Sequence, residues 1–440
     1  MEAIDRLIET DRKIPKRIDV IGDVMQDVWL FGYTEVCQED CLKFVEERRK
    51  VVPGGAGNAA RQLENWNSEC SLWGESECSL REESIAPTNK IRMVANGKII
   101  FRHDIEKRPL NDKKFPADYL SSIYEDPDAI LISDYDKGFL SEKGIEHIIR
   151  IFSQENVPVV VDAKRNSKVY SGAIIKANEV WFAREKDFYY WSRNAVMTRG
   201  HRSPRLFYNV QPGRPEVVSP EPVPERSSVS CINHVGAGDC FAAHLVLALA
   251  HGLSLEDASE IAHAAGRVYV QHPLNRPPWP HEIRKDLDPI GGKILSSSSL
   301  HALRESISGR IVFTNGVFRI PHAGHTWFLE WAKSQGDILV VGINDDLSAR
   351  LLDRGFCLSL GERTRLLAGQ QSVDWVVPFS EAEPLEAISQ LKPDVLAKGH
   401  EYENTNVPGS DRVQQVVFAP PSPYADHSSD LVTTIRENRG

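Results

Sequence analysis

The sequence lacks the features of membrane, disulfide-rich and nucleic-acid-binding proteins. No apolar run approaches the ~18 residues that a membrane-spanning helix needs, and the opening residues, MEAIDRLIETDRKIPKR, contain no signal-peptide core. The seven cysteines include no CxxC pair, so reduced thiols are expected. With 52 Lys and Arg against 62 Asp and Glu, the net charge of −10 does not favour nucleic acid. These patterns predict a cytoplasmic protein without nucleic-acid or membrane partners.

The length of 440 residues exceeds what one ordinary hydrophobic core supports, so two domains are expected. Apolar content of 41% and charged content of 26% are typical of a globular protein. Residues 273–309 contain several prolines, Gly291-Gly292 and four consecutive serines, a composition typical of a linker. We therefore predict one domain over residues 1–285, a linker over 286–308, and a second domain over 309–440.

Short apolar runs alternate with helical patterns on both sides of this linker. Residues 18–24 contain an apolar run that ends in a Gly-Asp turn, and the apolar runs in 129–136 and 157–164 end in acidic or basic residues. Residues 142–152, between the two later runs, have helical spacing. Strands of a parallel sheet deliver polar residues to a crevice at their carboxyl ends in this way. The pattern restarts with an apolar run at 310–314. The predicted fold class is therefore α/β, with doubly wound parallel sheets.

Two histidines open the helix that follows the strand at 310–314. His322 and His325 lie on one helical face, where the free N–H groups of the helix start also bind phosphate. Gly324 allows phosphate to approach the backbone. Nucleotidyl transfer needs such groups, because charge develops on the α-phosphate and the departing pyrophosphate. Ordinary capping histidines are the alternative, but the strand–turn–helix setting favours the catalytic hypothesis.

Residues 310–402 resemble the nucleotidyltransferase half of the bacterial bifunctional heptose-7-phosphate kinase/heptose-1-phosphate adenylyltransferases. The likeness lies in TNGVFRIPHAGH and, more specifically, in SVDWVVPF and KPDVLAKG. It implies a Rossmann-like domain in which His322 and His325 are catalytic. The family has Asp where this chain has Arg319, a change that bears on rate or substrate. The resemblance implies that the nucleotide-binding residues are Thr314, Asn315, Gly316, Phe318, Gly324, Asn344, Asp345, Arg350, Arg363, Lys398, Ser428 and Ser429.

Gly236-Ala-Gly-Asp239 opens an apolar helix in the first domain. The backbone of such a turn binds phosphate, and Asp239 is placed to accept the proton of an attacking hydroxyl. The tetrapeptide alone is a common helix entry. It is preceded, however, by GDVMQD at 22–27, PGGAGN at 53–58, SDYDKG at 133–138 and DAK at 162–164, an order that favours a sugar kinase.

In that order the segments resemble the ribokinase/phosphofructokinase-B family, and most closely the kinase half of the same bifunctional enzymes. The resemblance implies a parallel central sheet with a small β lid, and Asp239 as the catalytic base. It implies nucleotide binding by Asn178, Gly236, Ala237 and Gly238. It also implies that the substrate-binding residues are Asp23, Asp27, Gly54, Gly55, Asn58, Lys90, Arg92, Asp136 and Lys164.

The kinase half departs from this family at three positions. Asn233 replaces an Asp and Trp181 replaces a Glu, both of which lie near Mg²⁺ in relatives, and Ser203 replaces a glycine of the nucleotide turn. Because phosphoryl transfer relies on positioning and electrostatics, losing two acids is expected to slow it. Asp239, the expected base, is retained.

Three hypotheses follow. The first is a bifunctional enzyme that phosphorylates heptose 7-phosphate at C1 and transfers AMP from ATP to heptose 1-phosphate, releasing pyrophosphate. The second is a nucleotidyltransferase whose kinase-like domain only binds sugar phosphate or dimerises, and the third is a non-catalytic sensor or assembly module. The first is favoured, with ATP and Mg²⁺ as cofactors, metal ligands unknown, sugar phosphates as substrates, a separate phosphatase in the pathway and a homodimer as the expected assembly.

Overall fold

The computed structural model describes residues 2–36, 42–74, 88–96, 98–105, 126–192, 194–211, 214–216, 229–352 and 357–424. The chain divides into two compact units, Met1–Ile283 and Arg284–Gly440, which we call the first and second unit. In the described residues no helix is both long and apolar enough to cross a membrane.

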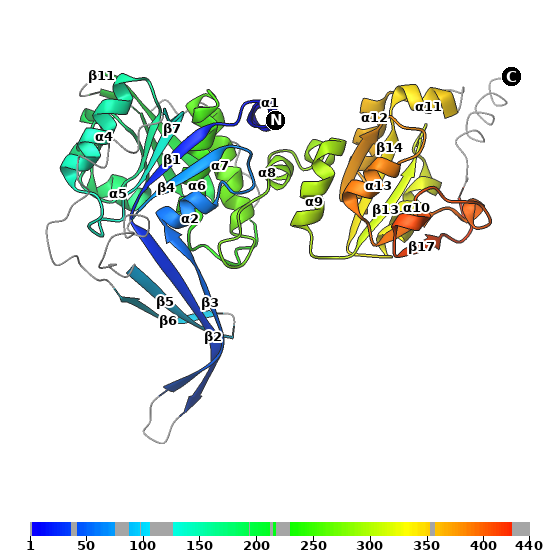
Figure 1. Cartoon of the computed structure of the whole chain (residues 1–440), viewed down its shortest axis with the longest axis horizontal. Coiled ribbons are helices and arrows are strands. Elements are labelled where there is room, and N and C mark those ends of the chain that lie inside the picture. The colour runs from blue at the N-terminus through cyan, green and yellow to red at the C-terminus, as the bar shows by residue number, and fades with distance from the viewer. Residues whose placement is uncertain are drawn as a thin grey trace. The chain divides into compact units, whose positions relative to one another are not determined.

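The first unit is built on an eight-stranded sheet with the order β12-β11-β10-β9-β8-β7-β1-β4 (Figure 1). Neighbouring strands from β10 to β4 are parallel, whereas β11 and β12 are antiparallel additions. The strands are β1 (Arg17–Gly22), β4 (Glu69–Trp73), β7 (Ala129–Ser133), β8 (Val159–Asp162), β9 (Ile174–Asn178), β10 (Asn194–Arg199), β11 (Arg202–Gln211) and β12 (Arg214–Glu216).

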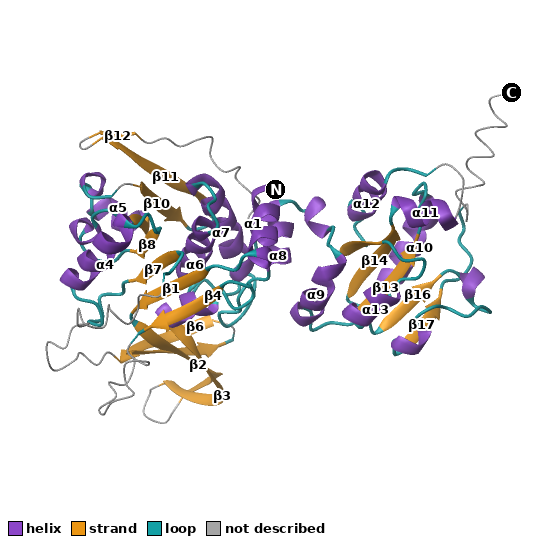
Figure 2. Ribbon diagram, turned by 45° about the horizontal axis from the view of Figure 1, so that its top comes forward, coloured by secondary structure: helices purple, strands orange, loops and turns teal. Residues whose placement is uncertain are grey.

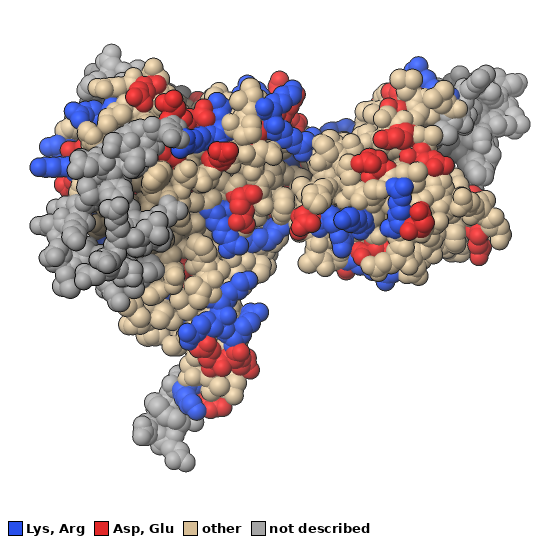
Figure 3. Space-filling view, viewed as in Figure 1, with Lys and Arg blue, Asp and Glu red and all other residues tan. Residues whose placement is uncertain are grey.

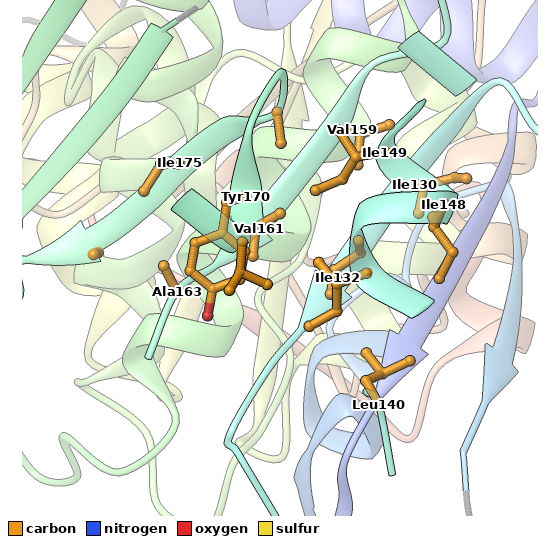
Figure 4. Packing of buried hydrophobic residues seen from close by; sticks show 14 of the residues in the cluster. Ile130, Ile132, Leu140, Ile148, Ile149, Val159, Val161, Ala163, Tyr170 and Ile175 are labelled. Atoms are coloured by element: carbon orange, nitrogen blue, oxygen red, sulfur yellow. The ribbon is translucent and has the colours of Figure 1, made fainter. Parts of the chain in front are cut away.

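Helices cover both faces of this sheet, with α4 and α5 on one face and α6 and α7 on the other (Figure 2). Figure 4 shows how α4 packs Ile148 and Ile149 against Ile130 and Val159 of the sheet. Burial of each such side chain contributes ~1.5–3 kcal/mol, so this face supplies much of the core. The helices are α1 (Glu2–Lys13), α2 (Ala56–Arg61), α4 (Glu142–Gln154), α5 (Glu179–Arg184), α6 (Ala237–Ala250) and α7 (Leu255–Tyr269), with 3₁₀ turns η2 (Ser167–Tyr170) and η3 (Phe188–Tyr190). Helix α8 (Pro280–Leu287) contains the boundary between the two units.

A second sheet of four strands projects from the body of the first unit (Figure 1), and we call it the lid. Its order is β3-β2-β5-β6, with β2 (Val24–Val36), β3 (Leu42–Gly55), β5 (Thr88–Ala95) and β6 (Lys98–Ile105). The chain passes from β1 through Asp23 directly into β2, and β3 runs directly into α2. The lid is therefore joined to the central sheet at the residues expected to bind the sugar.

The second unit has a five-stranded parallel sheet with the order β15-β14-β13-β16-β17. Strand order reverses between β13 and β16, which is where nucleotides bind in such folds. Leu329 of α10 and Leu367 of α12 pack on one face, and Leu303 of α9 and Ile388 of α13 on the other. The elements are α9 (Leu300–Ser306), β13 (Ile311–Gly316), α10 (Ala323–Lys333), β14 (Ile338–Asn344), α11 (Asp346–Leu352), α12 (Leu360–Ala368), β15 (Trp375–Phe379), α13 (Leu385–Leu391), β16 (Val395–Lys398) and β17 (Gln415–Phe418), with 3₁₀ turns η4 (Gly291–Lys293), η5 (Ser297–Ser299), η6 (His400–Tyr402) and η7 (Ser410–Arg412).

Residues 286–308, expected to be a linker, are instead part of the second unit. Leu295, Leu300 and Leu303 are buried in its core. The Leu295 N–H donates to the carbonyl of Val376 at 2.9 Å, which ties the segment to β15. The many serines and glycines of this segment suggested a linker. Its few leucines are nevertheless spaced so that they reach the core of the second unit.

Candidate active sites

In the first unit, Gly236 lies where α6 approaches α2. It has φ +86°, a conformation that glycine adopts without strain. A Cβ at this position would lie 2.4 Å from Asn58 Nδ2 and 2.5 Å from the Tyr269 hydroxyl oxygen. Only glycine therefore lets the first turn of α6, with Ala237 and Gly238, come this close to Asn58.

Asp239 is the buried centre of this site, with 3% of its surface exposed. Asn58 Nδ2 donates to Oδ2 at 2.8 Å, and the Tyr135 hydroxyl donates to Oδ1 at 2.7 Å. Burial raises the pKa of Asp239, and the nearby Asp162 carboxylate raises it further, whereas the two donors lower it. A carboxylate with a raised pKa is a stronger general base once it is deprotonated, so the position suits proton removal from a hydroxyl.

Lysine side chains surround Asp239. Lys176 Nζ donates to Asp162 Oδ1 at 3.1 Å, and Lys164 Nζ lies 3.4 Å from the same oxygen. Lys90 and Lys164 both place their ammonium groups over the Tyr135 ring, 4.6 and 5.1 Å from its centroid. Burial lowers the pKa of Lys90, and the Asp27 and Asp239 carboxylates oppose that shift. Positive charge is thus concentrated around the base, as a site for phosphate groups requires.

The residues expected to hold the sugar gather at the junction between sheet and lid. Asp23 accepts backbone N–H groups from Tyr135, Lys137 and Phe139 at 2.8 to 3.2 Å, so it orders that loop. Burial raises the pKa of Asp23 despite these donors.

Asp27 and Arg92 form a buried pair, with Nη1 2.7 Å from Oδ1. A Cβ at Gly54 would lie 2.9 Å from Asp27 Oδ2, and Gly55 has φ +58°. Both glycines therefore permit the close pairing of β2 and β3 beside Asp27. Arg92 reaches Asp27 from the neighbouring strand β5, where Lys90 is aligned with Asp27.

Two predicted positions have other partners. Asp136 is largely exposed and lies 3.1 Å from Arg165 Nε, next to Asp134, which is 3.1 Å from the same nitrogen. Asn178 caps α5, accepting the Trp181 N–H at 3.0 Å. Both side chains hold the surrounding loops in place.

Sequence reasoning missed Tyr135 and Lys176. Tyr135 lies inside a motif from which only its neighbour Asp136 was chosen. Lys176 carried one signal, a lone lysine in the apolar strand Ile174–Asn178. A charged side chain buried in such a strand needs a partner, which the structure supplies as Asp162.

Asn233 and Trp181 stand where the resemblance implies acidic residues near Mg²⁺, and both side chains are engaged with the protein. The Asn233 amide donates to Asn275 Oδ1 at 3.3 Å, and the Val235 N–H donates to Asn233 Oδ1 at 3.0 Å. The buried Trp181 indole donates to the carbonyl of Arg165 at 2.9 Å. An indole and an engaged amide are poor ligands for a hard cation, so these residues do not fit a metal held by the protein.

In the second unit, His322 and His325 lie together at the start of α10. His322 is the N-cap residue, and its Nδ1 accepts the Gly324 N–H at 3.2 Å. The two imidazole centroids are 4.0 Å apart, and Phe318 lies 5.0 Å from His325. Phe318 has φ +47°, which turns the chain sharply between β13 and α10. The pair is thus fixed beside the free N–H groups of a helix start, which favours phosphate binding.

Lys398 joins β16 to β13 at the point where the strand order reverses. Its Nζ donates to Asn315 Oδ1 at 2.6 Å and lies 5.3 Å from the Tyr402 ring centroid. Burial lowers the pKa of Lys398 to about 8. Thr314 Oγ1 is buried without a hydrogen-bond partner in the described part of the chain, and Gly316 ends the same strand. These groups lie at the carboxyl ends of β13 and β16, where folds of this kind bind nucleotides.

Arg363, expected to contact phosphate, has a fully buried side chain that holds three loops together. It donates to the carbonyls of Val317, Asn344 and Leu358 at 2.7 to 2.9 Å, and to Asp346 at 2.8 Å. All its nitrogens are engaged, so it positions the turn that precedes His322. This correction follows from helix orientation, which sequence spacing does not reveal.

The remaining predicted positions of this site vary in exposure. Asn344 is buried and its amide donates to the carbonyl of Glu381 at 3.3 Å. Asp345 accepts the Ser348 N–H at 2.7 Å and so starts α11, on which Arg350 is exposed. Ser428 and Ser429 lie outside the described residues.

Comparisons with known proteins place both halves in known families. Residues 313–430 match the cytidylyltransferase-like family, and residues 190–282 match the pfkB family of carbohydrate kinases. The bifunctional protein HldE of Helicobacter pylori is 30% identical over 436 residues, covering 90% of this chain and 94% of the relative. HldE of a Nitratiruptor species is 30% identical over 451 residues, covering 91% and 95%. Phosphofructokinase-2 from Escherichia coli, solved with substrates and products, is 14% identical with a TM-score of 0.47, covering 63% of this chain and 100% of that chain.

Proposed function

This chain belongs to the family of bifunctional HldE proteins, and we propose that it makes an ADP-heptose through two reactions, one in each unit. The observation that carries the proposal is that Asp239 and the His322–His325 pair both lie at helix starts beside parallel sheets. Each centre has the chemistry of its own family, a carbohydrate kinase and a nucleotidyltransferase. We place both reactions in the cytoplasm.

The first reaction transfers the γ-phosphoryl group of ATP to the C1 hydroxyl of heptose 7-phosphate. Asp239 accepts the hydroxyl proton, and the O–P bond to ADP breaks as the new O–P bond forms. Asn58 and Tyr135 hold the carboxylate in position. Lys164 and the N–H groups at the start of α6 stabilise the charge on the phosphates, and Mg²⁺ enters as the counter-ion of ATP.

The second reaction joins heptose 1-phosphate to AMP. A sugar-phosphate oxygen attacks the α-phosphorus of ATP, and the bond to pyrophosphate breaks. His322, His325 and Lys398 stabilise the charge that develops on the phosphate oxygens. Because the first product carries phosphate at C1 and C7, a separate phosphatase must remove the C7 phosphate between the two reactions.

Two incubations of the full chain test the proposal. With heptose 7-phosphate and MgATP we expect ADP, and with heptose 1-phosphate and MgATP we expect pyrophosphate, with CTP and GTP as comparisons for the base. Asp239→Asn should abolish the first reaction only, and His325→Ala the second only. Pyrophosphate without any ADP would leave a nucleotidyltransferase with a non-catalytic kinase-like unit, and loss of both reactions in either variant would contradict two independent sites.

We also propose that the chain forms a homodimer through the lid. Val51, Ile100 and Phe101 have 50%, 47% and 53% of their surfaces exposed. Val51 lies on the edge strand β3, and the other two lie on β6, the opposite edge of the lid. Basic side chains also gather on the lid (Figure 3). Apolar side chains so exposed on one sheet favour association. Sedimentation should show a dimer that Phe101→Ala weakens and Lys98→Ala does not, and a wild-type monomer would refute this assembly.

A further inference from the structure

Gln62 is a buried amide at the end of α2 that neither proposed reaction uses directly. Its backbone N–H donates to the carbonyl of Asn58 at 3.1 Å, so the two side chains lie one helical turn apart on the same face. Both residues have 0% of their surface exposed. Gln62 Nε2 donates to Asn58 Oδ1 at 3.0 Å. The contact therefore joins two buried amides, one of which donates to Asp239.

The hydrogen bonds around Asn58 fix the direction in which its amide faces. Its Nδ2 donates to Asp239 Oδ2 at 2.8 Å and lies 3.5 Å from the carbonyl oxygen of Gly236, and both oxygens are acceptors. Its Oδ1 faces the amide nitrogen of Gln62, which is a donor. Turning the Asn58 amide over would place an oxygen against the Asp239 carboxylate and a nitrogen against a nitrogen. Gln62 therefore enforces the orientation in which Asn58 donates to the base.

The oxygen of the Gln62 amide is not matched in this way. Gln62 Oε1 is buried and has no hydrogen-bond partner among the residues that the structure describes. A buried oxygen without a donor costs stability, whereas an apolar side chain of similar size does not carry that cost. Stability alone thus favours leucine or methionine at this position. The presence of an amide is better explained by what its nitrogen does to Asn58.

We propose that Gln62 is a positioning residue for the kinase reaction, which holds the Asn58 amide so that Asn58 donates to Asp239 and keeps the carboxylate of the base in place. The inference rests on the proposed function, because Asp239 is the base of that reaction. Gln62 acts through Asn58 and touches neither sugar nor nucleotide. The titratable neighbours of Asp239 stay unchanged in every variant below, and they are Lys90, Tyr135, Asp162, Lys164, Lys176 and Tyr269.

Steady-state ADP release by the full chain tests this role in Gln62→Leu, which removes the donor and nearly keeps the size. We expect kcat to fall about 10- to 100-fold, the effect of losing the Asn58–Asp239 hydrogen bond, with the KM for ATP unchanged. The acidic limb of the pH profile should move to higher pH, since Asn58 lowers the pKa of Asp239. Gln62→Asn keeps an amide and should retain more of the rate. Gln154→Leu, at an exposed glutamine of α4, should behave as the wild type.

The Asn58→Ala background separates a positioning role from a structural one. If Gln62 acts through Asn58, Gln62→Leu should change kcat by less than about twofold in that background and leave the pH profile in place. A fall in kcat of the same size in both backgrounds would overturn the inference, and so would a wild-type pH profile in Gln62→Leu. Pyrophosphate release by the second unit should stay unchanged in all these variants.

Urea unfolding at two pH values tests the contact without relying on catalysis. Gln62→Leu raises the pKa of Asp239 further, so its stability relative to the wild type should be lower at pH 8 than at pH 5. This pH dependence should disappear when both proteins also carry Asp239→Asn. If the wild type releases no ADP but the pattern appears, the kinase reaction fails and Gln62 keeps its role toward Asp239. If ADP is released but neither its pH profile nor this pattern responds to Gln62→Leu, the kinase reaction stands and the inference fails.

Discussion

Gly236 offers the sharpest test of how the kinase site is built. In Gly236→Ala the new methyl meets two obstacles, a left-handed φ of +86° and the Asn58 amide at 2.4 Å. The conformation costs ~1–2 kcal/mol and the overpacking ~1–3 kcal/mol, so we expect a loss of about 2–5 kcal/mol in the free energy of unfolding of the first unit. Gly252→Ala is the matched control, because Gly252 follows the same helix, has φ +73° and has nothing within 4 Å of the point that a Cβ would occupy. The control should lose only the conformational part.

The same pair of variants also separates activity from stability. Relieving the clash moves Asn58 away from Asp239, and a displacement near 1 Å at a reacting group costs roughly 100-fold in rate. ADP release should therefore fall about 100-fold in Gly236→Ala and stay near wild type in Gly252→Ala. Pyrophosphate release, which depends on the second unit, is the internal control in both. Equal urea midpoints and ADP rates within threefold for the two variants would refute this reasoning.

Three further substitutions test other contacts. Arg363→Met should destabilise the second unit by ~3–5 kcal/mol, because it leaves buried carbonyls unpaired, whereas exposed Arg365→Met should cost under ~0.5 kcal/mol in urea unfolding. Leu303→Ala should cost ~2–5 kcal/mol in the same assay if the expected linker is core, and a neutral effect would contradict that packing. Tyr135→Phe removes a donor that lowers the pKa of Asp239, so the acidic limb of the ADP-release profile should move to higher pH; an unchanged limb would rule out this hydrogen bond.

The strand–helix alternation and the positions of the reactive groups could be predicted from the sequence. Buried parallel strands are continuous apolar runs, and Asp23 and Asn315 lie at the carboxyl ends of two of them. Asp239 and the two histidines lie at helix starts. A helix start is set by the few residues next to it in the chain, so a short motif is enough to predict it.

What sequence reasoning missed depends on partners distant in sequence. Lys176 and Asp162 meet because β8 and β9 align, and the Tyr135 hydroxyl reaches Asp239 across 104 positions of the chain. Arg363 could be recognised as important from its motif, but its carbonyl partners follow from the direction in which α12 packs. Spacing shows that a side chain is buried or polar, and tertiary packing decides what it contacts.

We expect Lys398 to couple nucleotide binding in the second unit to proton uptake. Burial holds its pKa at about 8 against the usual 10.5, with Glu401 opposing the shift, and its hydrogen-bond partner Asn315 is neutral. The charge is therefore present below about pH 8 and lost above it. A phosphate oxygen would favour the charged form, so ATP binding should raise this pKa and draw a proton from the buffer.

The measurement is the KM for ATP in pyrophosphate release between pH 7 and 9.5. We expect KM to rise above pH 8 in the wild type, as the ammonium loses its proton, and to stay flat in Lys398→Arg, whose guanidinium keeps its charge throughout. Lys392→Arg changes a lysine at the end of α13 and should keep the wild-type profile. Since the folded state holds the proton less tightly than the unfolded state, stability should also increase as pH rises from about 8 toward 10.5. A flat wild-type KM across this range would show that the charge of Lys398 does not contribute to ATP binding.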